Sequence, residues 1–171
     1  LTIQIIENVQ DLLETMQSLV KTHDVLIHSM AVSDYTPIYM TGFEQITASQ
    51  DLTEFLNKTN DQGKISSKDE YQVLFLKQTP KIISRVKNWN PNIRLIGFKL
   101  LVDVSKEELL TVARASLAKN QAEIIVANDL YDISNNQHHA YLVKENSVIE
   151  ANTKEEIAQQ LVTHIHTKDN L

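Results

Sequence analysis

Short apolar runs rich in β-branched residues alternate along this chain with segments in which apolar residues recur at helical spacing. Runs of the first kind are typical of strands, and a spacing of three and four is typical of amphipathic helices. Alternation of the two favours a mostly parallel sheet with helices on both faces. We therefore expect an α/β fold: a Rossmann-like, three-layer αβα architecture with an antiparallel hairpin at its C-terminal edge. The predicted strands are 3–6, 25–27, 73–76, 93–101, 124–127, 140–144 and 148–150, and the predicted helices are 9–20, 79–89, 105–120 and 153–165.

Local signals place three of the helix starts. Ser105 with Glu108, and Thr153 with Glu156, have the spacing of a capping box. The pair 79–80 is Thr-Pro, which predicts an N-cap followed by proline at the first helical position. These helices are therefore expected to begin close to those residues.

The stretch 38–70 is the least regular part of the sequence. It is polar, it contains Gly42 and Gly63, and it offers only one short helix near 51–57. A long segment without strong elements is often functional, for example as a flexible lid over a site. A chain of 171 residues suits one domain. We therefore expect a single α/β domain over 1–171 with a lid at about 38–70.

Composition excludes several classes of function. The net charge of −6 speaks against a nucleic-acid binder, and no apolar run is long enough for a membrane span. The absence of cysteine removes disulfides, thiolate nucleophiles and cysteine–zinc sites. The neighbouring histidines 138–139, and His164 with His166, do not share a face on a strand or a helix, so we expect no metal site. A cytoplasmic protein without nucleic-acid or membrane partners is expected.

Polar residues follow or interrupt several predicted strands. In open α/β sheets ligands bind beyond the carboxyl ends of the strands, where helix N-termini attract anions. We expect one common edge to carry 28–35, 79–81, 97–99 and 128–129, with Asn128 and Asp129 ending their strand. Lys64 on the lid adds a positive charge. The pattern predicts a site for a phosphorylated ligand.

At the same segments the chain resembles phosphopantothenate–cysteine ligases. The matching pieces are AVSDY at 31–35, GKISS at 63–67, TPKII at 79–83, LIGFK at 95–99, and KN at 119–120 followed by IVAND at 125–129. Each piece is weak alone, but their order and spacing fit the family. Family members begin with a strand and a glycine-rich turn that this sequence does not contain, so the resemblance implies a chain without roughly the first third of the enzyme.

The resemblance implies an amide-forming ligase of coenzyme A biosynthesis. The carboxylate of 4′-phosphopantothenate would be activated by a nucleoside triphosphate with Mg²⁺, CTP more than ATP, and cysteine would then capture the acyl-nucleotide. Such chemistry needs positioning and charge neutralisation rather than a nucleophilic side chain. A homodimer is implied, with the lid and the hairpin 140–150 as the expected contacts.

The resemblance also implies roles for individual residues. Lys64 would be catalytic, neutralising phosphate and helping to expel the nucleotide. The other expected nucleotide-binding residues are Asp34, Thr79, Pro80, Lys81, Ile82, Ile83, Phe98 and Lys119. Ala31, Asn128 and Asp129 are expected at the edge of the site without an assigned role.

The chain departs from the family pattern in three places. Lys81 stands where bacterial members often have Asp, and Ala115, beside Arg114, stands where a second basic residue is expected. The lid is longer than in many bacterial members, and its family pattern Lys-x-Lys-Lys becomes Lys64-Ile-Ser-Ser-Lys68 here. These departures bear on which nucleotide is used more than on which reaction is catalysed.

Plainer interpretations exist for each of these residues. Asp34 suits a turn, Lys64 a solvated loop, Phe98 the core, and Lys119 the negative end of a helix dipole. Two other functions also fit: a non-catalytic nucleotide- or sugar-phosphate-binding module, and a structural subunit whose partner supplies the glycine-rich segment. A dehydrogenase is disfavoured because the GxGxxG fingerprint is absent.

Overall fold

The computed structural model describes residues 2–60, 68–134 and 137–168. The chain forms two compact units, Leu1–Ala31 with Ile82–Leu171, and Val32–Lys81. We call the first the α/β unit and the second the inserted unit. The segment 38–70 falls inside the inserted unit, and the single-domain assignment stays a prediction. Within the described ranges, no helix combines the length and the apolar character that crossing a membrane requires.

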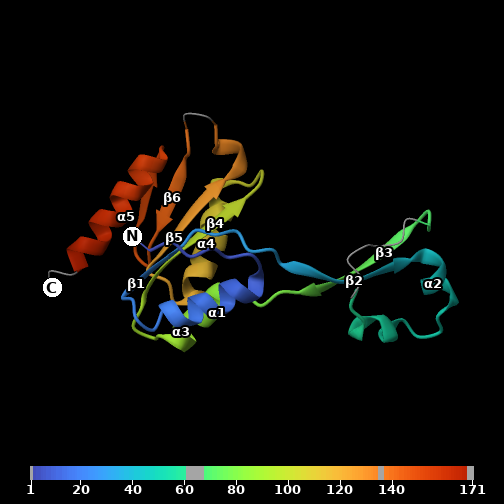
Figure 1. Cartoon of the computed structure of the whole chain (residues 1–171). Coiled ribbons are helices and arrows are strands. Elements are labelled where there is room, and N and C mark those ends of the chain that lie inside the picture. Colours follow the sequence, from blue (N-terminus) through green and yellow to red (C-terminus); the bar gives the residue numbers. More distant parts are fainter. Residues whose placement is uncertain (1, 61–67, 135–136, 169–171) are drawn as a thin grey trace. The chain divides into compact units, whose positions relative to one another are not determined.

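A five-stranded sheet forms the centre of the α/β unit (Figure 1). Its strand order is β1-β4-β5-β6-β7. The first three strands are parallel and the last two are antiparallel, as the sequence predicted. The strands are β1 (Val25–His28), β4 (Arg94–Leu101), β5 (Ile124–Asp129), β6 (Ala140–Val143) and β7 (Val148–Ala151).

Helices cover both faces of this sheet. Helix α5 (Lys154–Lys168) packs Ile157 and Leu161 against a cluster that includes Ile96 and Val126. Helix α4 (Lys106–Asn120) packs against the opposite face. Burial of one such aliphatic side chain contributes about 1.5–3 kcal/mol, so these two contacts hold the three layers together.

The remaining helices lie on the α4 face. Helix α1 (Val9–Leu19) lies beside Leu26 of β1, and Leu26 pairs in register with Leu95. The 3₁₀ helix η2 (Ile82–Arg85) runs directly into α3 (Val86–Trp89). A Cβ atom on Gly97 would lie 2.8 Å from the Ile83 Cδ1 atom and 2.9 Å from the Ile125 Cδ1 atom. A glycine in β4 therefore lets η2 pack close to the sheet.

Both capping boxes predicted from the sequence start helices. The Ser105 hydroxyl accepts the Glu108 N–H at 3.1 Å, and the Thr153 hydroxyl accepts the Glu156 N–H at 3.1 Å. The Glu156 carboxylate in turn accepts the backbone N–H of Asn152 at 2.7 Å. These bonds satisfy amides that the first helical turn leaves unpaired.

The inserted unit is built on an antiparallel pair, β2 (Tyr35–Gly42) and β3 (Gln72–Gln78). Helix α2 (Phe43–Ala48) and the 3₁₀ helix η1 (Leu52–Asn57) follow β2. The rings of Tyr39, Phe55 and Phe75 form a cluster with centroid distances of 5.5–6.2 Å, in which Phe55 stacks on the other two. A two-stranded sheet is marginal alone, and this aromatic cluster supplies its core.

Three predictions about elements are wrong. Residues 3–6 form no strand, since no other strand pairs with them and Ile3 and Ile5 are exposed. The run 73–76 belongs to β3 and pairs with β2 rather than with the main sheet. The predicted lid is also more regular than expected, because 38–42 is part of β2.

Asn128 and Asp129 do not interrupt their strand. Both lie within β5, and both are buried. The Asp129 carboxylate accepts the N–H groups of Val104 and Tyr131 at 2.8 Å and that of Asp103 at 3.1 Å. Asp103 has a φ of 55°, a conformation that non-glycine residues rarely adopt. Asp129 therefore braces the loop that connects β4 to α4.

We predict that Asp129→Asn lowers the melting temperature and that the deficit shrinks in acid. The N–H groups of Val104 and Tyr131 hold the pKa of the Asp129 carboxyl below its usual range, against the opposing effect of burial. Because the pKa is lower in the folded state, the stabilisation is complete above the ordinary carboxyl pKa of about 3.9 and is lost as the pH falls through the folded value.

Thermal unfolding of both proteins between neutral and acidic pH measures this difference. Asp132→Asn, an exposed neighbour, is the matched control and should change the melting temperature little. A melting-temperature deficit in Asp129→Asn that does not depend on pH would contradict stabilisation by an ionised Asp129 carboxylate.

Candidate functional site

Two loops that are distant in sequence are joined at the base of the inserted unit. The Thr79 N–H donates to the Asp34 carbonyl oxygen at 2.9 Å, and the Thr79 hydroxyl donates to the Ser33 carbonyl oxygen. The Ser33 hydroxyl donates to the Tyr35 carbonyl oxygen at 2.6 Å. Thr79 is buried. Its hydroxyl is therefore used for this junction and not as a helix cap, which is why the next helix starts at Ile82.

The junction brings Asp34 and Lys81 together. The Lys81 ammonium group donates to the Asp34 carboxylate, although the residues are 47 positions apart. The Asp34 and Lys81 side chains are 61% and 52% exposed, so both groups lie at the surface. An exposed pair of this kind contributes little to stability. Its effect is electrostatic, because it places one carboxylate and one ammonium at a defined position.

The parallel strands place a second group of predicted residues at one edge of the α/β unit. Register pairs Leu101 with Asp129, so β4 and β5 end side by side, and the parallel β1 points to the same edge but ends earlier, with His28 beside Gly97. Phe98 is partly buried and packs on the α5 face. Asn128 lies two residues after Val126 of that same face and is 7% exposed. Phe98 and Asn128 therefore share the α5 face near the carboxyl edge.

Several other predicted residues also lie in the α/β unit. Ile82 is 2% exposed and belongs to the core, whereas Ile83 reaches the space over Gly97. Ala31 is exposed, and Pro80 in the inserted unit is half-buried. Asp129 is engaged with three backbone N–H groups, so its carboxylate serves the loop before α4.

Lys119 is not near the carboxyl edge. It lies exposed in the last turn of α4, which leads into the start of β5. A helix of 15 residues is about 22 Å long, so Lys119 is separated by this length from the edge where α4 begins. Its nucleotide-binding role stays a prediction. Lys64 lies outside the described residues.

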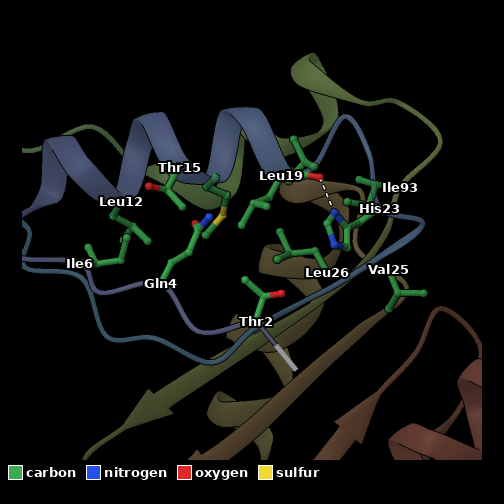
Figure 2. Close-up of a pocket in the computed structure, with 12 residues that line it drawn as sticks. Thr2, Gln4, Ile6, Leu12, Thr15, Leu19, His23, Val25, Leu26 and Ile93 are labelled. Atoms are coloured by element: carbon green, nitrogen blue, oxygen red, sulfur yellow. Dashed lines mark hydrogen bonds between the residues drawn. The ribbon is translucent and has the colours of Figure 1, made fainter.

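A cavity of about 370 Å³ lies elsewhere in the α/β unit (Figure 2). It is enclosed by residues 2–6, α1 and the start of β1, and aliphatic side chains such as Leu12, Leu19 and Leu26 form most of its wall. The ring of His23 is turned to the Leu19 carbonyl oxygen at 2.8 Å. None of the predicted site residues that the structure describes lines this cavity, and the described residues of its wall include no lysine or arginine to bind a phosphorylated ligand.

Sequence reasoning missed two features of the site. The pairing of Lys81 with Asp34 had no local signal, because it depends on the ladder of β2 and β3 that brings 34 and 79–81 together. The burial of His28 at the end of β1 was also not predicted. Residues two apart on a strand face the same side, so extending the predicted strand 25–27 by one residue would have placed His28 on the face of Leu26.

The sequence matches the DNA/pantothenate metabolism flavoprotein C-terminal domain family over residues 43–168. It is 31% identical over 160 residues to the coenzyme A biosynthesis bifunctional protein CoaBC of Thermococcus kodakarensis, and 26% identical over 159 residues to the CoaBC protein of Methanocaldococcus jannaschii. Each match covers 91% of this chain and 34% of the relative. The chain thus spans about a third of the length of these curated relatives.

Solved structures agree. A crystal structure named DNA/pantothenate metabolism flavoprotein from Streptococcus pneumoniae is 59% identical, with a TM-score of 0.92, and the match covers 98% of this chain and 73% of that one. A Cab2 mutant in complex with phosphopantothenate-cysteine shares the fold at 16% identity, with a TM-score of 0.64 over 95% of this chain and 52% of that one. From the length of the family match and these likenesses, the chain belongs to the DNA/pantothenate metabolism flavoprotein C-terminal domain family.

Proposed function

We propose that this chain carries the phosphopantothenate–cysteine ligase activity of coenzyme A biosynthesis. The names of its relatives support this function, since two of them are coenzyme A biosynthesis proteins. The observation that carries it is the junction of the loops at 33–34 and 79–81. It presents a carboxylate and an ammonium group, Asp34 and Lys81, within the segments that resemble these ligases.

The proposed reaction has two steps. A carboxylate oxygen of 4′-phosphopantothenate attacks the α-phosphorus of a nucleoside triphosphate, and pyrophosphate leaves. The amine of cysteine then attacks the acyl carbon, loses a proton, and displaces the nucleoside monophosphate to leave an amide. Neither step needs an enzyme nucleophile, so the chain has to bind, orient and neutralise charge.

Asp34 and Lys81 suit complementary parts of such substrates. A carboxylate accepts hydrogen bonds from hydroxyl or amine groups, which a ribose or a base supplies. An ammonium group neutralises phosphate as a point charge. On binding, the Lys81 ammonium can turn from Asp34 to a phosphate oxygen, which frees the Asp34 carboxylate to accept from the neutral part of the ligand.

Mg²⁺ belongs in this proposal as part of the nucleotide substrate. Among the described side chains, no group of three His, Asp or Glu residues is arranged to hold a metal ion. Mg²⁺ commonly binds through substrate phosphates with only one or two carboxylates from the protein. The proposed substrate is therefore the Mg²⁺ complex of CTP, with ATP as the alternative. A homodimer in the cytoplasm is part of the same proposal.

The first prediction from this proposed function concerns the overall reaction. The full-length protein, given 4′-phosphopantothenate and the Mg²⁺ complex of CTP, should release pyrophosphate before cysteine is added and form the amide only afterwards. Parallel reactions with ATP identify the nucleotide. A folded protein that binds a nucleotide but releases no pyrophosphate with either one would favour the non-catalytic binding module.

A second prediction separates the two steps. Lys64→Gln should still release pyrophosphate but form amide about 10²–10³-fold more slowly, because loss of one group that neutralises developing charge typically costs this much. Quenched-flow measurement of pyrophosphate and amide in the same reaction gives both rates. Lys77→Gln, an exposed lysine of β3, is the matched control. Equal loss of both steps would contradict a role confined to nucleotide expulsion.

A third prediction concerns the ion pair. Lys81→Gln should raise KM for the phosphorylated substrates roughly three- to tenfold with little change in kcat, since half-exposed charges are screened by water. The same change in an Asp34→Asn background should have a smaller effect, because the two charges interact. Lys77→Gln, an exposed lysine of β3, serves as the control. Strict additivity of the two substitutions would show that the pair does not act together.

A further inference from the structure

His28 occupies an unusual position for a polar residue. It is the last residue of β1, it pairs in register with Gly97, and it is only 9% exposed. In a parallel pair, registered residues face the same side of the sheet, so His28 lies on the α4 face. It therefore stands at the carboxyl end of β1, beside the middle of β4, and ligands bind beyond the carboxyl ends of strands in sheets of this kind.

The imidazole of His28 has no hydrogen-bond partner among the described residues, although four other histidine rings do have one. His23 contacts the Leu19 carbonyl oxygen at 2.8 Å, His139 the Asn152 side chain at 2.9 Å, His164 the Glu123 carboxylate at 3.0 Å, and His166 the Val162 carbonyl oxygen at 2.9 Å. The buried side-chain atoms that lack a partner belong to Asn120 and His138 and do not include the ring nitrogens of His28. These nitrogens therefore reach the surface unsatisfied.

The chemistry of this ring is that of a neutral group. Burial lowers the pKa of the His28 imidazole, which favours the uncharged form near neutral pH. A neutral imidazole offers one N–H donor and one acceptor nitrogen. Such a group matches a hydroxyl, an amide or the edge of a nucleobase.

We propose that His28 is a substrate-binding residue that hydrogen-bonds an uncharged polar group of the substrate at the carboxyl end of β1. This inference rests on the proposed ligase function and adds a contact to it. The uncharged group comes either from the amides and hydroxyls of 4′-phosphopantothenate or from the ribose and base of the nucleotide. The two sources are separated by adding each substrate alone.

A leucine at this position distinguishes binding from packing. His28→Leu places an apolar side chain at this buried position and removes both hydrogen-bonding nitrogens. If His28 only fills the core, the His28→Leu protein should be as stable as the wild type or more stable, and its KM values should not change. If His28 binds substrate, His28→Leu should leave the melting temperature unchanged and raise KM for one substrate about tenfold, with KM for the other unaltered.

Imidazole ¹⁵N resonances of the full-length protein give the direct readout. Titration with 4′-phosphopantothenate alone, and separately with the Mg²⁺ complex of CTP, should shift the His28 resonances with one of the two. The resonances of His166, which is hydrogen-bonded to its own helix, should not move. His166→Gln is the control variant for the kinetics.

The possible outcomes distinguish failure of this inference from failure of the proposed ligase function. Saturable substrate binding that leaves the His28 resonances in place, with an unchanged KM in His28→Leu, overturns the role of His28 and leaves the ligase intact. Failure of the wild-type protein to bind either substrate overturns both. A selective shift with either substrate supports the proposal and names the group that His28 contacts.

Discussion

The parallel pairing of β4 with β1 on one side and β5 on the other sets the position of every edge residue in the α/β unit. Because the register is His28 with Gly97 and Leu101 with Asp129, β4 and β5 end side by side, whereas β1 ends beside the middle of β4. The same register divides their side chains between the α4 and α5 faces. A shift by one residue would exchange these faces, so burial of Ile96 and Ile125 on opposite sides fixes the geometry of the edge.

Features of the fold that depend on neighbouring residues could be predicted from the sequence. The capping pairs Ser105–Glu108 and Thr153–Glu156 act within one helical turn, and both start helices in the structure. Pairing between distant strands could not be predicted in this way. The β-branched run at 3–6 suits a strand, but no described strand pairs with it. The run 73–76 pairs with β2, whose residues lie more than 30 positions earlier in the chain.

The candidate site shows the same division. Asp34 and the segment 79–81 could be chosen from sequence because they lie in recognisable motifs, but their contact depends on a ladder that no local pattern reveals. Asp129 appeared to end a strand because aspartate is common in turns, yet three backbone N–H groups compensate its burial. The position of Lys119 depends on the direction of α4, which leads from the carboxyl edge back to the start of β5.

The junction at the base of the inserted unit also bears on how such a chain can change during evolution. Thr79 holds the two ends of a long excursion together by bonds to Ser33 and Asp34, so neither end depends on the length of what lies between them. Insertions and deletions are tolerated best where the flanking ends stay fixed, and a longer loop costs little additional closure entropy. Relatives can therefore differ in the middle of this unit while the carboxylate and ammonium at its base keep their relation.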